Sequence, residues 1–438
     1  MDEQKLLASA QKVLDQNDRG SYTVPAGDLY PHQWLWDSCF IAIGLRHLDV
    51  GRAQTELESL TSGQWSNGML PDMVFGKPGS AGLDELLWDS FMSPFSPPDV
   101  GTSGITQPPM MAEAVWRVGQ KLPMPERRSW FNKMLPAIIH FHEWLYEERD
   151  PKNEGLVTLV HPYEAGLDNA PPWMDELHHH GIPWWVKLID KLRLDLIVDL
   201  VRRDTRNTRP GQRMTNIEAL SLFVAMRRLR KKSYDSAKIL QKPDMAVQDL
   251  LYNCILIKAN ERLADIAKTA GVKLPAALTA KAELTKKALN LLWDEESGQY
   301  FCRSYASGEL IAEPSIETFM PLYAGTVSKE RAETLVQLLG KHRAYKLNWP
   351  VPSAPQTSAY FNPDRYWQGP TWVNTNWLII EGLKNYGYLE ETDELKSKTL
   401  RMVEKNGFCE YYNPHTAKGL GADTFSWSAA LTIDLLKT

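Results

Sequence analysis

Apolar residues recur at helical spacing along most of the 438-residue chain. In residues 277–293, Leu278, Ala282, Leu289 and Leu292 fall at intervals that can share one face of a helix. The same periodicity predicts close to a dozen helices. They cover residues 33–47, 50–62, 108–121, 128–148, 215–230, 244–270, 275–293, 328–339, 371–386, 391–405 and 425–436.

Strand signals interrupt this pattern only briefly. The clearest are at Gly155–Val160 and Tyr300–Arg303. No long linker separates the predicted helices, which favours one closed array of helices over several small domains. We therefore expect an all-α fold in a single domain, 1–438.

Long loops rich in proline, glycine and aromatic residues connect the helices. They are residues 20–32, 64–108, 161–186, 347–371 and 407–424. Long ordered loops in a compact protein are usually functional. The least regular stretch is 161–214, which we interpret as an active-site loop followed by an insertion and a candidate lid. Beyond residue 176, a surface excursion without a role is an equal alternative.

Composition and charge exclude several classes of protein. A hydrophobic content of 43% and a charged content of 24% are typical of a globular protein. The net charge of -5 argues against nucleic acid as a partner, because phosphate binding needs a basic face. No apolar run approaches the roughly 20 residues of a membrane span, and the first residues lack the apolar stretch of a secretory signal.

The four cysteines are Cys39, Cys254, Cys302 and Cys409, and none belongs to a Cys-x-x-Cys pair. Zinc and redox centres are therefore disfavoured. Scattered thiols in a long chain indicate a reducing compartment, so we expect a cytoplasmic protein.

The chain has sixteen tryptophans, and many of them stand in short clusters with polar residues. Indole rings stack on sugar faces but also fill cores, so their number alone does not indicate sugar binding. Their clustering with polar residues is what favours a sugar-binding site. In YPHQWLWDSCF, the residues Tyr30, Trp34, Trp36 and Asp37 place aromatic walls beside a carboxylate. Asp37 is a candidate for binding sugar hydroxyls, although it could also stabilise the start of a helix.

Two further segments have the same character. In TSGITQPP, Gln107 precedes two prolines that can begin a helix, and it is either a loop stabiliser or a ligand donor. In YWQGPTWVNTNWL, Tyr366, Trp367 and Trp372 lie at the loop end and are candidates for the site, whereas Trp377 is a candidate for the core.

Candidate catalytic carboxylates lie in two loops far apart in the sequence. EAGLDNAPPWMD offers Glu164, Asp168 and Asp175, with alanine, proline and tryptophan neighbours that could raise the pKa of a general acid. An ordinary Asx-turn at Asp168 is the alternative. Glu410 lies between aromatic residues in FCEYY, where a buried glutamate must be paired or functional. Inverting glycosidases use two such carboxyl groups roughly 6.5–9.5 Å apart, one as acid and one as base.

Taken in order, these motifs resemble glycoside hydrolase family 63, and most closely its short bacterial branch of glucosylglycerate and mannosylglycerate hydrolases. The resemblance runs from about residue 20 to the C-terminus. It is carried by QWLWDSCF, GQWSNGMLPDM, TSGITQPP, GLDN, YWQGPTWVNTNW and FCEYYNPHTAKGLGADTFSWSAA.

The resemblance implies an (α/α)6 toroid, inversion of configuration and no metal or organic cofactor. It implies a small glycoside as substrate, with Asp168 as general acid and Glu410 as general base. It also implies pocket roles for Tyr30, Trp34, Trp36, Asp37, Gln107, Tyr366, Trp367 and Trp372. A homo-oligomer is one of the assemblies left open.

The chain departs from the family pattern in places that concern the leaving group. Asp72 stands where the family often has histidine, and Gln368 where it often has arginine. In the glycerate-cleaving branch an arginine before Pro-Thr binds the glycerate carboxylate. Here Arg213 precedes Met214-Thr215, so Arg213, or an arginine within 202–209, is the candidate for that contact.

Three alternatives stay open. A trehalase would share the Trp-Asp motifs and the carboxylate chemistry. A sugar epimerase would need a histidine pair, which the contiguous His178, His179 and His180 do not suggest, because neighbouring side chains of a helix do not face each other. A non-catalytic sugar-binding protein would share the aromatic pocket.

Overall fold

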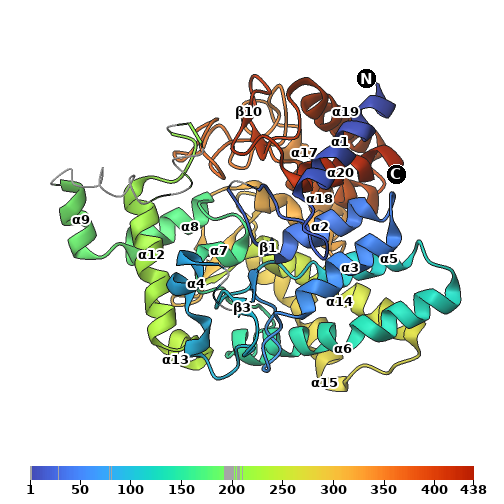
Figure 1. Ribbon diagram of the computed structural model, residues 1–438. Coiled ribbons are helices and arrows are strands. Elements are labelled where there is room, and N and C mark those ends of the chain that lie inside the picture. Colours follow the sequence, from blue (N-terminus) through green and yellow to red (C-terminus); the bar gives the residue numbers. More distant parts are fainter. Residues whose placement is uncertain are drawn as a thin grey trace.

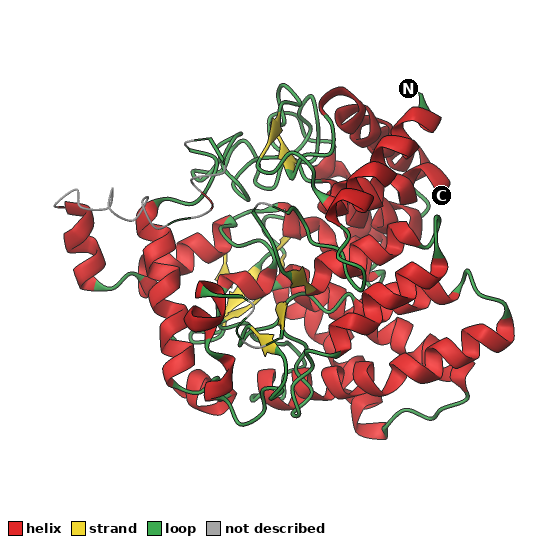
Figure 2. Ribbon diagram, viewed as in Figure 1, coloured by secondary structure: helices red, strands yellow, loops and turns green. Residues whose placement is uncertain are grey.

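The computed structural model describes residues 2–27, 29–77, 79, 81–191, 202, 204, 208–209 and 211–438. Helices dominate the fold, and the strands are short (Figure 2). Every helix predicted from periodicity is present, with its ends moved by a few residues. The principal helices are α1 (Glu3–Asn17), α2 (Leu35–Leu45), α3 (Val50–Thr61), α5 (Met111–Gly119), α6 (Met124–Arg149), α12 (Asn216–Lys231), α14 (Leu250–Ala270), α15 (Ala276–Ala288), α16 (Met320–Ala324), α17 (Lys329–Leu339), α18 (Val373–Asn385), α19 (Leu389–Asn406) and α20 (Ser426–Lys437).

Six of the described helices pack in a cycle. Helix α2 packs against α5, α5 against α14, α14 against α16, α16 against α18, α18 against α20, and α20 against α2. All eleven residues of α2 are buried, as expected for a helix with neighbours on every side.

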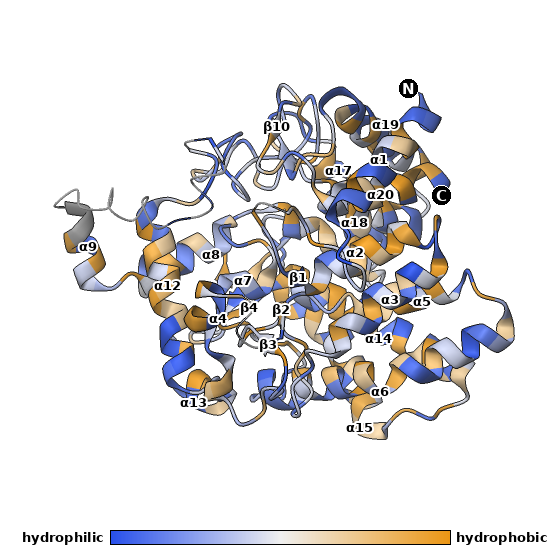
Figure 3. Ribbon diagram, viewed as in Figure 1, coloured by the Kyte–Doolittle hydropathy of each residue, from blue (hydrophilic) through white to orange (hydrophobic). Residues whose placement is uncertain are grey.

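A second set of helices covers this cycle from outside. Helix α3 packs on α2, α6 on α5 and α14, α19 on α18, and α1 on α20 (Figure 1). These helices alternate apolar and polar stripes, because only one face meets the inner helices (Figure 3). Since α1 and α20 pack together, the first and last helices lie side by side.

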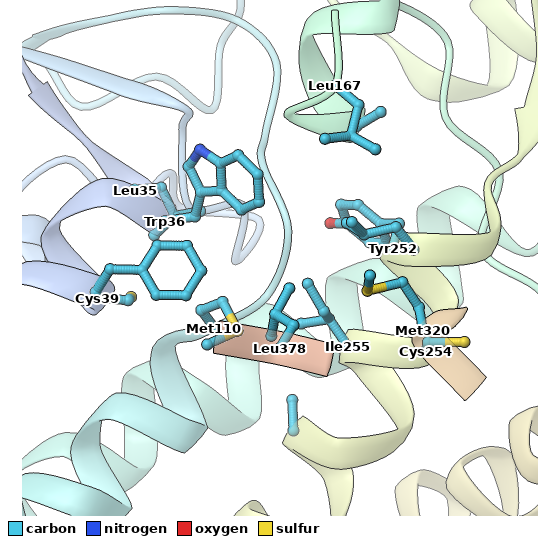
Figure 4. Packing of buried hydrophobic residues seen from close by; sticks show 14 of the residues in the cluster. Leu35, Trp36, Cys39, Met110, Leu167, Tyr252, Cys254, Ile255, Met320 and Leu378 are labelled. Atoms are coloured by element: carbon cyan, nitrogen blue, oxygen red, sulfur yellow. The ribbon is translucent and has the colours of Figure 1, made fainter. Parts of the chain in front are cut away.

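The space inside the cycle is filled with side chains. Trp36 of α2, Met110 before α5, Ile255 of α14, Met320 of α16 and Leu378 of α18 converge there, all nearly inaccessible to solvent (Figure 4). The centre is therefore a packed core that fixes the inner helices relative to one another.

A buried ionic cluster lies toward the carboxyl-terminal ends of the inner helices. Arg117 of α5 pairs with Glu113 and with Glu381 of α18, and its guanidinium lies 4.7 Å from the centre of the Trp377 ring. Asp434 of α20 accepts from Trp377 Nε1 at 2.8 Å. Trp377 thus belongs to the core, as predicted.

Two predictions of secondary structure were wrong in detail. The predicted helix 244–270 begins only at Leu250, because Val247–Gln248 forms strand β4 of a small sheet. The predicted strand Gly155–Val160 is reduced to a bridge between Leu159 and Val247. Helices α1 and α16 were not predicted, although Leu6, Ala10 and Leu14 have helical spacing.

The strands are short and antiparallel, so the fold is not purely helical. Their sheets have the orders β1-β2-β3, β4-β7-β8, β5-β6 and β9-β10. They comprise β1 (Gln33–Trp34), β2 (Met73–Gly76), β3 (Gly101–Thr102), β4 (Val247–Gln248), β5 (Trp293–Asp294), β6 (Gln299–Tyr300), β7 (Cys302–Ser304), β8 (Leu310–Ile311), β9 (Tyr411–Tyr412) and β10 (Gly419–Leu420). The predicted strand Tyr300–Arg303 corresponds to parts of β6 and β7.

The segment 161–191 is more helical than its composition suggested. It contains the helices α7 (Pro162–Ala165), α8 (Pro171–Glu176), a π-helical turn (Leu177–Gly181) and α9 (Trp184–Lys191). Most of the remainder of the candidate lid lies outside the described residues.

The other short helices are α4 (Leu83–Trp88) and α13 (Ser236–Gln241), with 3-10 turns at Ser90–Met92, Leu289–Leu292 and Ile316–Phe319. Among the described residues, no helix is both long and apolar enough to cross a bilayer.

Candidate active site

A pocket opens at the amino-terminal ends of α2, α5 and α20. It is lined by Pro25, Tyr30, Trp34, Trp36, Asp37, Gln107, Gly166, Asp168, Tyr366, Trp367, Glu410, Phe425 and Trp427. The two candidate catalytic carboxylates, Asp168 and Glu410, therefore line the same pocket.

Asp168 follows a tight turn that only glycine can make here. Gly166 ends α7 with a φ of 72°, and a Cβ on it would come within 2.6 Å of the Trp36 ring. The side chain of Asp168 accepts a hydrogen bond from the Tyr366 hydroxyl at 3.2 Å. Burial raises the pKa of Asp168 to about 7, with the Glu410 charge adding to the rise and the Tyr366 bond and Arg213 charge opposing it.

The neighbouring amide ties this turn to the opposite wall. Asn169 is fully buried, and its Oδ1 accepts from the backbone N–H of Trp367 at 2.9 Å. Tyr366 has a φ of 38°, a conformation that tyrosine adopts only when its surroundings impose it. The Asn169–Trp367 bond is one of those constraints, so the loop carrying Asp168 and the loop carrying Tyr366 are fixed together.

Glu410 is 1% exposed and begins a short hairpin. Its own N–H donates to the carbonyl of Ala422, and its Oε2 accepts from the Ala422 N–H at 3.0 Å. Between them, Gly421 has a φ of 69°, and a Cβ there would lie 2.3 Å from Glu410 Oε2. The hairpin therefore needs glycine at this position to seat the carboxylate.

Arg213 lies on Glu410. Both terminal nitrogens of its guanidinium donate to the two oxygens of Glu410, and Nη1 also contacts the Tyr30 hydroxyl at 2.9 Å. The guanidinium is 4.7 Å from the ring centre of Tyr366 and 5.7 Å from that of Tyr411. The sequence suggests Arg213 as a ligand of the substrate carboxylate; in this structure its partner is the candidate base, and it is not among the pocket-lining residues.

The start of α2 supplies one wall of the pocket. Trp34 is the N-cap, and Trp36 donates its backbone N–H to Gln107 Oε1 at 3.3 Å. Asp37 lies in the first turn, buried, and its pKa is raised well above the usual value by burial and by the charges of Glu410 and Asp168. The helix amino terminus favours a carboxylate at this position, so Asp37 can both stabilise α2 and face the pocket.

The aromatic wall has two layers. Trp367 lines the pocket and stacks on Trp372 with ring centres 3.6 Å apart, and Trp372 stacks in turn on Tyr411. Trp372 therefore supports the wall from behind. Phe425 and Trp427, at the start of α20, line the pocket but were not singled out from the sequence; the FSW motif that carries them was the available signal.

The other carboxylates of the acid-bearing segment have other partners. Glu164 is fully buried, and both of its oxygens accept hydrogen bonds from Arg149. This pair attaches α7 to the end of α6, so Glu164 has a structural role. Asp175 is 3.3 Å from His179 and does not line the pocket. Neither His178 nor His179 lines it, so these two residues do not form a catalytic histidine pair there.

One group among the described residues has side chains suited to a metal ion. Asp249, Cys302 and Glu317 bring their ligand atoms within 4.8 Å of one another, away from the pocket lining. Internal donors already reach it: Trp173 Nε1 donates to Asp249 at 2.9 Å, and the Cys302 thiol donates to Glu317 at 3.0 Å. These bonds account for the group as part of the packed interior.

Comparison with known proteins gives a consistent result. The family model for the mannosylglycerate hydrolase MGH1-like glycoside hydrolase domain matches residues 30–428. A mannosylglycerate hydrolase of Thermus thermophilus is 37% identical, over 97% of this chain and 99% of its own. A glucosylglycerate hydrolase of Mycolicibacterium hassiacum is 31% identical, over 99% of this chain and 98% of its own.

Solved structures agree. The crystal structure of a glycoside hydrolase family 63 mannosylglycerate hydrolase from Thermus thermophilus, in complex with Tris and D-glycerate, superposes with a TM-score of 0.88 at 36% identity, covering 98% of this chain and 99% of that one. A neutral trehalase from Saccharomyces cerevisiae, at 20% identity and a TM-score of 0.57 over 95% of this chain and 73% of that one, shares the fold alone.

The pKa of Asp168 predicts a pH dependence. A carboxyl group with a pKa of about 7 is protonated below that pH and charged above it. If Asp168 gives a proton during the reaction, kcat/KM should fall as the pH rises through about 7, by about tenfold per unit at higher pH. Initial rates between about pH 5 and 9 on a glycosyl-glycerate would measure this. A profile that stays flat to the alkaline end of this range would remove Asp168 from the role of acid.

Proposed function

The chain belongs to the mannosylglycerate hydrolase MGH1-like family of glycoside hydrolases, and we propose that it hydrolyses a small α-linked glycosyl glycerate with inversion at the anomeric carbon. The observation that carries this proposal is the pocket itself. Two carboxylates from distant parts of the sequence line it, and their surroundings differ in the way that an acid and a base require.

The environment of each carboxylate suggests its role. Asp168 has a pKa of about 7 and can hold a proton at neutral pH, so it is suited to protonate the leaving glycosidic oxygen. Glu410 pairs with Arg213 and accepts a backbone N–H, which are partners of a charged carboxylate. It is therefore suited to take a proton from the attacking water. Water's oxygen bonds to the anomeric carbon as the glycosidic bond breaks, which inverts the configuration.

The names of the relatives support glycerate as the aglycone. Relatives 37% and 31% identical act, by name, on mannosylglycerate and glucosylglycerate, and one solved relative is a complex with D-glycerate. We propose mannosyl or glucosyl glycerate as the substrate class.

The fold proposal follows from the packing. We propose that the described helices form an (α/α)6 toroid in one catalytic domain spanning 1–438. The cyclic packing of α2, α5, α14, α16, α18 and α20, with α1, α3, α6 and α19 outside it, supports this architecture.

A substrate screen tests the proposed function. Purified protein is incubated with α-mannosyl and α-glucosyl conjugates of D-glycerate, with their glycerol counterparts and with α,α-trehalose. Proton NMR then shows which anomer of the released sugar appears first. We expect a glycerate conjugate to be cleaved fastest and the β-anomer to appear first. Preference for trehalose, or release of the α-anomer, would contradict the proposal.

Variants of the two carboxylates separate acid from base. Asp168→Asn cannot protonate the leaving oxygen, so hydrolysis of the natural glycoside should fall on the order of 10²–10⁴-fold. A glycosyl fluoride leaves without that proton and should be partly spared. Glu410→Gln cannot activate water and should be slow on both substrates. Steady-state rates on the two substrates measure the difference, and near-normal turnover by Glu410→Gln would show that the base has been misassigned.

Arg213 should discriminate between aglycones. An arginine fork binds a carboxylate with two hydrogen bonds, which a neutral glycerol cannot reproduce. Arg213→Ala should therefore raise KM for the glycerate conjugate far more than for the matched glycerol conjugate. Equal changes in the two KM values would place the carboxylate contact elsewhere.

A further inference from the structure

The carboxylate of Glu410 has no acceptor position left. A carboxylate offers about four lone-pair sites on its two oxygens. Oε1 accepts from the Tyr30 hydroxyl at 2.8 Å and from Arg213 Nη1 at 3.0 Å. Oε2 accepts from Arg213 Nη2 and from the Ala422 N–H at 3.0 Å. A general base must accept a proton from water, so one of these donors has to leave first.

Arg213 is the donor best able to leave. The Ala422 N–H belongs to the backbone of the hairpin that seats Glu410, so its position is fixed. The Tyr30 hydroxyl contributes one hydrogen bond and is in turn contacted by Arg213. Arg213 supplies two of the four bonds through a long side chain with several rotatable torsions. Moving this side chain therefore frees both oxygens without moving the backbone.

The main chain next to Arg213 is held, so a change can be confined to the side chain. The carbonyl of Gln212 accepts from the Tyr366 N–H at 3.1 Å and from the Tyr411 hydroxyl at 2.7 Å. Gln212 and Arg213 are both buried. The backbone next to Arg213 is thus fixed by Tyr366 and Tyr411. The guanidinium contacts Glu410, Tyr30 and the surrounding aromatic rings.

The guanidinium also has a donor to spare. Its Nε is buried and has no hydrogen-bond partner among the described residues. A guanidinium carries five N–H donors, so its free edge can begin to bind a second carboxylate before it leaves Glu410. Replacing one carboxylate partner by another keeps the buried charge paired. A neutral ligand would leave that charge unpaired, which is strongly unfavourable inside a protein.

We propose that Arg213 holds Glu410 in a resting pair, and that the carboxylate of the substrate's aglycone takes over the guanidinium and so releases Glu410 to act as base. The aglycone is then an activator of the reaction as well as a binding element. This rests on the proposed function, because it needs Glu410 as base and an anionic group in the aglycone position. A neutral glycoside of the same size binds but leaves Glu410 saturated, so selectivity arises in kcat as well as in KM.

The experiment separates the activating carboxylate from the reacting sugar. The substrates are α-D-mannosyl fluoride and α-D-glucosyl fluoride, which carry no carboxylate, and fluoride release is followed with an electrode. The added activator is 3-hydroxypropionate, which is glycerate without the oxygen that bridges to the sugar and so leaves room for the fluorine. Its amide is the matched neutral control.

We expect 3-hydroxypropionate to accelerate fluoride release by the wild-type protein on the order of tenfold or more, with saturation, and the amide to leave the rate unchanged. Arg213→Ala should lose the response to the carboxylate, because the guanidinium that the carboxylate would take over is absent. If this variant does not fold, the response of the wild-type protein to 3-hydroxypropionate is enough to test the proposal.

Failure of this proposal differs from failure of the proposed function. Cleavage of a glycerate conjugate together with fluoride hydrolysis that 3-hydroxypropionate leaves unchanged or slows would overturn the release mechanism alone. Activation of fluoride hydrolysis without cleavage of any glycerate conjugate would support the release mechanism and overturn the substrate. Inactivity toward fluorides and glycerate conjugates alike would overturn both.

Discussion

Three carboxylates, Asp37, Asp168 and Glu410, share one pocket inside the protein, and their burial beside one another is the constraint on which the site depends. Burial and the neighbouring charges raise the pKa of Asp37 and bring that of Asp168 to about 7. One guanidinium, Arg213, compensates Glu410. Among the described residues, Arg213 is the positive side chain paired with one of these three acids, so one acid can be charged while another keeps its proton, which is the difference that two-carboxylate hydrolysis uses.

The surrounding fold stabilises this arrangement. The inner helices α2, α5 and α20 direct their amino-terminal ends toward the pocket, where the backbone N–H groups favour negative charge. Toward the opposite ends, buried arginines balance acids instead. The hydrogen bond from His47, with the charges of Arg46 and Arg117, outweighs the effect of burial and lowers the pKa of Asp434 to about 2. The two ends of the helix cycle thus differ in charge chemistry.

The sequence predicted most of the helices and much of the pocket, because both depend on local patterns. Trp36 and Asp37 could be placed because they begin an apolar helix, and Trp377 could be assigned to the core because it lies within one. The partner of Arg213 could not be predicted, since the two residues are 197 positions apart and only packing brings them together. Strand β4 was mistaken for helix because a short apolar run such as Met245–Val247 has no decisive period.

The packing of α1 against α20 has a consequence for how the chain becomes an enzyme. Helix α20 touches both α1 and α2, and its first turn brings Trp427 to the pocket. During synthesis α1 and α2 leave the ribosome long before α20 exists, so their apolar faces must wait for a partner that lies much later in the sequence. Contacts between such distant segments also slow folding. The pocket is therefore complete only once α20 has packed against α1 and α2, because Trp427 at its start lines the pocket.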